Sequence, residues 1–163
     1  MNLSRNEEIK FFADVNVARL VRWLRAAGFD CVWEDAIADA DLVRRAIIER
    51  RAVLTLDKRL ASEWRADNIL LLRGNRAAEQ FAEIVARFKL KLPAPERFFT
   101  RCLICNQILQ GASEAEILAA EIPAAVREAQ KKFRRCPRCR RVYWEGSHAP
   151  RMRAAIGEVF NPR

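Results

Sequence analysis

Apolar and polar positions follow two alternating periods along the first ninety residues. Apolar runs of six or seven residues alternate with longer stretches in which apolar side chains recur every three or four positions. The runs are typical of buried strands, and the longer stretches are typical of amphipathic helices. The expected strands cover residues 9–14, 29–34, 52–57 and 68–74. The expected helices cover residues 16–28, 39–51, 58–65 and 76–88.

This alternation predicts an α/β fold, because strands that alternate with helices form a parallel sheet covered on both faces. The first helix shows the pattern most clearly, since its apolar positions share one face and Gly28 is placed to end it. We expect residues 1–92 to form this α/β domain. We expect residues 97–163 to form a second, smaller module with a helical insert and a C-terminal helix.

Acidic residues stand where the expected strands end. Asp14 ends the first strand, Asp57 ends the third, and Asp39 and Asp41 open the helix after the second. The carboxyl ends of parallel strands meet at one edge of a sheet, where gathered carboxylates repel unless a cation neutralises them. Mg²⁺ or Mn²⁺ suits such a site and can help to hydrolyse a phosphodiester. The alternative is that each Asp only caps the following helix.

Several other classes of protein are excluded or unsupported. No Gly-rich loop follows the first strand, so a dinucleotide site or a P-loop is not expected. The only histidine, His148, lies far from the strand ends, so Ser/His/Asp or Cys/His catalysis has no support. No apolar run reaches the length of a membrane span and residues 1–10 lack an apolar leader, so we expect a soluble cytoplasmic protein.

Four of the five cysteines form two C-x-x-C pairs, Cys102 with Cys105 and Cys136 with Cys139. Without a sign of export, two such pairs predict a tetrahedral structural Zn²⁺ site rather than disulfides. A redox pair or a cluster site is the alternative. The insert between the pairs, residues 111–133, is expected to be helical after its start. Cys31 lies in an apolar run and is expected to be a buried thiol.

The net charge of +9 comes mostly from the C-terminal third. Residues 1–96 hold 17 Lys and Arg against 15 Asp and Glu, whereas residues 97–163 hold 13 against 6. Arginines crowd the second cysteine pair, namely Arg134, Arg135, Arg138, Arg140 and Arg141. They exceed what the thiolates of a zinc site need, and Phe133, Tyr143 and Trp144 lie among them, which favours nucleic-acid binding. The alternative is a solvated ribbon whose aromatic rings pack on the neighbouring domain.

The order of several motifs resembles a known family. FFADVNVARLVRWLRAAGFD, DADLVRRA, AVLTLDKRLA, the first C-x-x-C pair and RRCPRCRRVYWEGSHAPRM together resemble the PIN-like ribonuclease domain with a C-terminal zinc ribbon, the "Mut-seven C-terminal" RNase family. The resemblance runs from about residue 9 to about residue 155. It implies a PIN-like sheet and a Mg²⁺- or Mn²⁺-dependent ribonuclease, with DNA not excluded as a substrate.

The resemblance also implies roles for individual residues. Asp14, Asp39 and Asp57 match the family's acids and would hold the catalytic metal, with Thr55 beside them. We expect Asp41 to be the fourth catalytic acid, with Asp35 in reserve. The expected nucleic-acid contacts are Arg19, Arg22, Arg25, Lys58, Arg59 and the five arginines of the ribbon, and an ordinary solvated surface is their alternative.

Two further points stay open in the sequence. Ala149 stands where the family usually has an aromatic residue after the histidine, which leaves the role of His148 open. The alternative to a ribonuclease is a non-catalytic nucleic-acid-binding protein in which the zinc ribbon binds and the α/β domain serves as a scaffold. A nuclease controlled by a protein partner is a third, weaker possibility.

Overall fold

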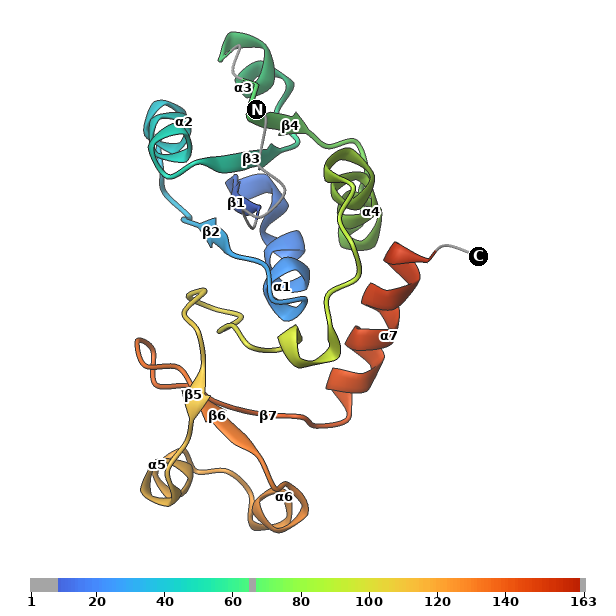
Figure 1. The fold of residues 1–163 in the computed structure, drawn as a ribbon. Helices are drawn as coiled ribbons and strands as arrows, with labels where there is room; N and C mark the ends of the chain where they lie inside the picture. Colours follow the sequence, from blue (N-terminus) through green and yellow to red (C-terminus); the bar gives the residue numbers. More distant parts are fainter. Residues whose placement is uncertain (1–8, 65–66, 162–163) are drawn as a thin grey trace.

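A four-stranded parallel sheet forms the centre of the computed structural model, which describes residues 9–64 and 67–161 (Figure 1). The strand order is β2-β1-β3-β4, and every neighbouring pair is parallel. The strands are β1 Lys10–Ala13, β2 Cys31–Trp33, β3 Arg51–Thr55 and β4 Ile69–Leu71. The predicted α/β fold is thereby confirmed. The expectation about the N-terminal leader concerns residues that lie mostly outside this description.

Helices cover both faces of the sheet because the side chains of its central strands alternate. Phe11 belongs to one buried cluster and its neighbour Phe12 to the other, and both side chains are fully buried. The helices are α1 Ala18–Ala26, α2 Asp39–Ile48, α3 Lys58–Glu63 and α4 Ala77–Phe88, preceded by the short 3-10 turn η1 Val15–Val17. In the described part of the chain, no helix has the length and apolarity that a membrane span requires.

Gly28 ends α1 as the sequence predicts. Its φ of +88° lies in the left-handed region, which favours glycine. A Cβ atom at this position would also come within 2.5 Å of the carbonyl oxygen of Arg97. The glycine therefore lets the chain after η2 (Pro95–Arg97) pass directly against the end of α1. Most elements are shorter than predicted; α2, for example, stops at Ile48, and Arg51 already belongs to β3.

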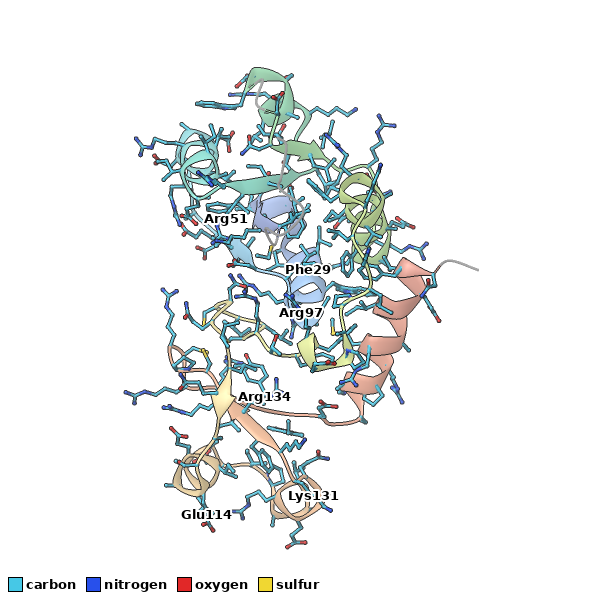
Figure 2. The ribbon with its side chains drawn as sticks, in the orientation of Figure 1. Phe29, Arg51, Arg97, Glu114, Lys131 and Arg134 are labelled. Atoms are coloured by element: carbon cyan, nitrogen blue, oxygen red, sulfur yellow. The ribbon has the colours of Figure 1, made fainter. Side chains whose placement is uncertain are left out.

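The C-terminal part begins with a small antiparallel sheet, the ribbon. Its strands are β5 Gln110–Gly111, β6 Phe133–Arg135 and β7 Val142–Trp144. The insert between β5 and β6 forms two short helices, α5 Glu114–Ala119 and α6 Ala124–Ala129. Pro123 separates them, because a proline cannot continue a preceding helix. Figure 2 shows Glu114 and Lys131 at the outer end of this part, far from Arg51 in the central sheet.

The last helix, α7 (His148–Phe160), packs against the α/β part rather than against the ribbon strands alone. Ile156 is fully buried in the same cluster as Phe11. The ring of Phe160 meets the edge of Phe81 with 5.6 Å between centroids. This helix was expected to belong to the module of residues 97–163 with the zinc ribbon. Its few apolar positions show that one face is buried, but they do not show which surface covers that face.

Candidate active site and zinc site

The carboxyl ends of β1 and β3 bring two of the predicted acids into one hydrogen-bond network. Because Ala13 pairs with Leu54, the residues that follow, Asp14 and Thr55, meet at the edge of the sheet. The hydroxyl of Thr55 donates to Oδ2 of Asp14 at 2.6 Å. The backbone N–H of Asp57 donates to the Thr55 hydroxyl oxygen at 2.9 Å. Thr55 thus connects Asp14 to the backbone of Asp57.

Both of these acids also cap helical segments. Oδ1 of Asp14 accepts the N–H of Val15 at 2.6 Å, and Oδ1 of Asp57 accepts the N–H of Arg59 at 2.7 Å. Asp14 and Asp57 are therefore helix caps, and their metal-binding roles stay predictions. Capping uses only part of each carboxylate, and Oδ2 of Asp57 has no protein donor among the described residues. A capping role and a metal-binding role are compatible here.

Asp39 and Asp41 stand apart from this network. Asp39 is the first residue of α2, whose N-cap is Ala38, so Asp39 does not cap its helix. Asp41 is exposed and forms an ion pair with Arg44 at 2.6 Å. Among the described residues, the only potential metal ligands gathered in a group of three or more within 4.8 Å are cysteines. The catalytic roles of Asp39 and Asp41, and of Asp35 in reserve, stay predictions.

Asn16 is a member of the network that the sequence analysis missed. Its side-chain NH₂ donates to Oδ2 of Asp14 at 2.7 Å, and its Oδ1 accepts the N–H of Leu56 at 3.0 Å. Asn16 therefore connects the loop after β1 to the loop after β3. The signal was present, because an amide two residues after a strand-end acid supplies another oxygen at the same edge. Asn16 and Thr55 together fix the orientation of the Asp14 carboxylate.

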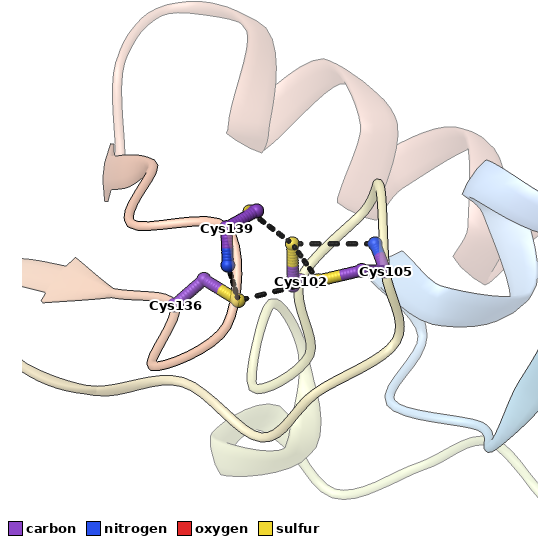
Figure 3. A group of neighbouring side chains, drawn as sticks. All are labelled: Cys102, Cys105, Cys136 and Cys139. Carbon is purple, nitrogen blue, oxygen red and sulfur yellow. Dashed lines mark hydrogen bonds between the residues drawn. The ribbon is translucent and has the colours of Figure 1, made fainter.

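The four cysteines Cys102, Cys105, Cys136 and Cys139 lie together as the sequence predicts (Figure 3). The sulfur atoms of Cys105 and Cys136 are 3.3 Å apart, and those of Cys102 and Cys139 are 3.6 Å apart. A tetrahedral zinc site with Zn–S bonds of about 2.3 Å separates its sulfur atoms by about 3.8 Å. These spacings are close to that value and well above the length of a disulfide bond. The cluster fits one zinc ion.

The two cysteine turns have matching backbones. In each turn the second cysteine donates its N–H to the sulfur of the first at 3.5 Å. The next residue, Asn106 or Arg140, donates its N–H to the carbonyl of the first cysteine at 3.0 Å. Both of these residues have a positive φ, 67° for Asn106 and 62° for Arg140. Each turn therefore presents two sulfur atoms to the same point.

Hydrogen bonds around the cluster favour a thiolate at one of its cysteines. Burial opposes ionisation of the Cys102 thiol, but hydrogen bonds from the Tyr143 hydroxyl and from nearby backbone amides outweigh it and lower its pKa to about 6. Burial, Cys136 and Cys102 raise the pKa of Cys105. One thiolate thus forms readily while its neighbour resists ionisation. A bound Zn²⁺ would remove this conflict, because it stabilises all four thiolates together.

The first cysteine turn docks on the central sheet through Arg25, which is only 3% exposed. Its guanidinium donates to the carbonyl oxygens of Cys31 at 2.9 Å, Leu103 at 3.0 Å and Ile104 at 2.6 Å. The prediction that Arg25 contacts nucleic acid is therefore wrong, and so is its alternative of a solvated helix face. Arg19, Arg22 and Arg25 recur every three residues, so the sequence does not distinguish Arg25 from the other two. Arg25 is buried because the first cysteine turn packs against it.

Asp30, beside Arg25, strengthens the same junction. Its carboxylate forms an ion pair with Arg51 at 2.6 Å and accepts the side-chain NH₂ of Asn106 at 2.8 Å. Arg101 donates to the carbonyl oxygen of Gly28 at 3.1 Å. Burial acts against the Asp30 carboxylate, but these donors outweigh it and lower its pKa. The ribbon and the sheet therefore meet through a half-buried polar junction.

Replacing Arg25 by methionine should lower the free energy of unfolding by about 3 kcal/mol, because three carbonyl groups lose a charged donor. Equilibrium urea denaturation measures this change. The matched control is Arg22→Met in the same helix, where the side chain is exposed and the change should stay within about 0.5 kcal/mol. Equal stability of the two variants would show that the Arg25 contacts contribute nothing.

Most of the other basic side chains proposed to contact nucleic acid are exposed. On the α/β part these are Arg19, Arg22, Lys58 and Arg59. On the ribbon they are Arg134, Arg138, Arg140 and Arg141. Arg135 is half-buried and forms an ion pair with Glu116 at 2.8 Å, so part of its charge is already compensated. Their contacts with nucleic acid stay predictions.

The ribbon lies at the opposite end of the sheet from the acids. The segment that leads into the ribbon contacts Ala26, Gly28 and Asp30 through Phe99, Arg101 and Asn106, where α1 ends and before β2 begins. Asp14, by contrast, lies where β1 ends and before α1 begins. The nine residues of α1 rise by about 1.5 Å each and separate the two places by about 14 Å. A single nucleotide cannot touch both.

Comparison with known proteins identifies the family of this chain. A protein-family model, the Mut7-C RNAse domain, matches residues 9–156. Searches of curated proteins and of solved structures gave no match. The matched residues include the strand-end acids, the whole zinc cluster and most of α7, so the match covers both ends of the molecule. The chain belongs to the Mut7-C RNAse domain family.

Proposed function

We propose that this protein is a PIN-like, metal-dependent ribonuclease that hydrolyses RNA phosphodiester bonds at the carboxyl edge of its sheet. The observation that carries the proposal is the connection of Asp14 to Asp57 through Thr55 on two adjacent parallel strands. Ligand sites in open α/β sheets lie at this edge. Membership in a family of RNase domains supports the same class of reaction.

The oxygen atoms at this edge fit a hard divalent cation such as Mg²⁺ or Mn²⁺. Asp14 and Asp57 would hold it, with Asp39 as the proposed third carboxylate. When bound, such a cation supplies Lewis-acid stabilisation of phosphate charge and activation of water. The residues present are compatible with this role, because the side chain of Asp57 keeps one oxygen without a protein donor among the described residues.

The protein's own side chains would orient the site and bind the substrate. Thr55 and Asn16 hold the Asp14 carboxylate in one orientation, which spares the site the cost of ordering it during the reaction. The exposed Lys58 stands at the start of α3, directly after Asp57. Arg19 and Arg22 are exposed on α1. These basic side chains would bind phosphates on either side of the cleaved bond.

The test is cleavage of labelled single-stranded RNA, duplex RNA and single-stranded DNA by the purified, zinc-containing protein. Each substrate is incubated with Mn²⁺, with Mg²⁺ or without an added divalent cation. We expect RNA to be cut only when Mn²⁺ or Mg²⁺ is added. Cutting that proceeds equally without these cations would contradict the proposed metal dependence, and cutting of DNA alone would contradict the proposed substrate.

A non-catalytic nucleic-acid-binding protein is the second candidate. One observation favours it, because the carboxylates of Asp14, Asp39 and Asp57 do not form a gathered group of ligands. In that case the ribbon would bind RNA through its exposed arginines, and the affinity would fall steeply with salt. Salt-dependent binding without cutting under any of the cation conditions above would favour this function.

A further inference from the structure

A mostly apolar pocket lies between the ribbon and the first turns of α7, away from the acidic edge. Its volume is about 350 Å³, within the range of about 300–1,000 Å³ that holds small ligands. Its apolar lining includes Phe99, Leu109, Tyr143, Trp144 and Met152. His148, whose role the sequence left open, lines the same pocket. Nothing in the proposed cleavage reaction uses this pocket.

The aromatic lining includes a ring with an accessible surface. Trp144 is 39% exposed although it lies in strand β7 of the ribbon. Its ring packs near the ring of Phe133, with 6.3 Å between the two ring centroids. The hydroxyl of Tyr143 is used inside the protein, because it lies 3.1 Å from the sulfur of Cys102. Trp144 is therefore the ring best placed to stack on a planar ligand.

The charges around the pocket favour an anionic ligand. Lys132 and Arg134 both line it and are exposed, and neither has a carboxylate partner among the described residues. Arg134, labelled in Figure 2, donates only to the carbonyl oxygen of Phe99 at 3.3 Å. The acid that lines the pocket, Glu145, is already paired with Arg153 at 3.2 Å. A planar apolar group next to a phosphate would complement this combination.

We propose that this pocket holds one unpaired nucleobase of an RNA strand, stacked on Trp144, with the adjoining phosphate bound by Lys132 and Arg134. The proposal rests on the proposed ribonuclease function and extends it to the form of the substrate. A base in a duplex is already stacked and paired, so only a single-stranded segment can fill the pocket. The pocket would therefore select single-stranded RNA.

The position of the pocket also separates the bound base from the cleaved bond. Phe99, in its wall, donates its N–H to the carbonyl of Ala26 at the end of α1, about 14 Å along that helix from its start near Asp14. The exposed Arg19 and Arg22 lie on α1 between the two places.

The experiment measures binding of a fluorescein-labelled single-stranded RNA of twelve nucleotides by anisotropy, without added Mg²⁺ or Mn²⁺ so that the RNA stays intact. Trp144→Ala should bind at least about fivefold more weakly, because it loses a stacking ring. Trp144→Phe should retain most of the affinity. Trp64→Ala is the matched control, since Trp64 is similarly exposed, 37%, but lies beyond α3. Zinc content and urea denaturation verify the fold of each variant.

Salt dependence separates stacking from charge. Trp144→Ala should leave the slope of log affinity against log salt unchanged, whereas Arg134→Ala should reduce it by about one. A second arm needs no variant, because an RNA backbone of equal length without bases should bind the wild-type protein as weakly as intact RNA binds Trp144→Ala. The result that supports the proposal is the loss of affinity in both arms.

Several results would overturn the proposal. These are equal binding by Trp144→Ala and Trp64→Ala, equal binding of the base-free backbone and intact RNA, duplex RNA bound as tightly as single strands, or no binding of single-stranded RNA. These outcomes are distinct from failure of the nuclease proposal. RNA held through its bases but never cut would leave the pocket in place and refute the ribonuclease.

Discussion

Replacing Asp57 by asparagine should reduce metal-dependent cleavage of RNA by at least about 100-fold. Asparagine removes the negative charge that a divalent cation needs. It keeps the side-chain oxygen that caps α3, because asparagine is as good an N-cap as aspartate. The variant should therefore keep its zinc and its free energy of unfolding. Initial rates of RNA cleavage with saturating Mn²⁺, measured beside urea denaturation, test both statements.

The matched control is Glu63→Gln, which removes a carboxylate from the other end of the same helix. Glu63 is exposed and pairs with Arg59 at 2.9 Å, so its loss should leave cleavage nearly unchanged. Undiminished cleavage by Asp57→Asn would show that Asp57 serves only as a helix cap. Asp14→Asn is a less clean test, because Asp14 is buried and accepts hydrogen bonds from Val15, Asn16 and Thr55.

Replacing Cys136 by serine should remove the zinc and unfold the ribbon. A structural zinc site contributes about 10–16 kcal/mol of binding free energy to the folded state, and three thiolates hold the ion far less well than four. Because α7 follows the ribbon and packs in the core with Phe11, loss of the ribbon should also lower the melting temperature of the whole chain. Zinc per chain, thermal unfolding and limited proteolysis measure these effects.

Cys31→Ala is the control for this experiment. Cys31 is fully buried under the end of α1 and lies outside the group of four cysteines whose sulfur atoms gather within 4.8 Å of one another. This variant should retain one zinc per chain. If Cys136→Ser also retains zinc and a folded ribbon, the cysteine cluster is not a structural zinc site.

The candidate active site and the ribbon lie at opposite ends of α1. The carboxylates lie where α1 begins and the zinc ribbon lies where it ends. Arg25 joins that end of the helix to the first cysteine turn through the carbonyl oxygens of Leu103 and Ile104. A strand bound at both places would lie along α1, and the fixed length of the helix would set the distance from the bound base to the cleaved bond.

Much of this protein follows from the sequence alone. The alternation of apolar runs and amphipathic stretches determined the α/β class, because burial of side chains on a strand or helix follows a short local period. The two C-x-x-C pairs predicted the cysteine cluster, because four soft ligands at this spacing suit one tetrahedral ion such as Zn²⁺. The meeting of Asp14 and Asp57 was also predictable, because parallel strands end at one edge, and their catalytic roles stay predictions.

Other features depended on contacts between distant parts of the chain. Arg25 looked like its exposed neighbours Arg19 and Arg22, and only the docking of the cysteine turn placed it in the interior. The packing of α7 on the core and the pocket beside Trp144 likewise join segments far apart in sequence. A local period shows that a face is buried but does not identify its partner. That partner is decided by the shapes and charges of surfaces that exist only after the chain has folded.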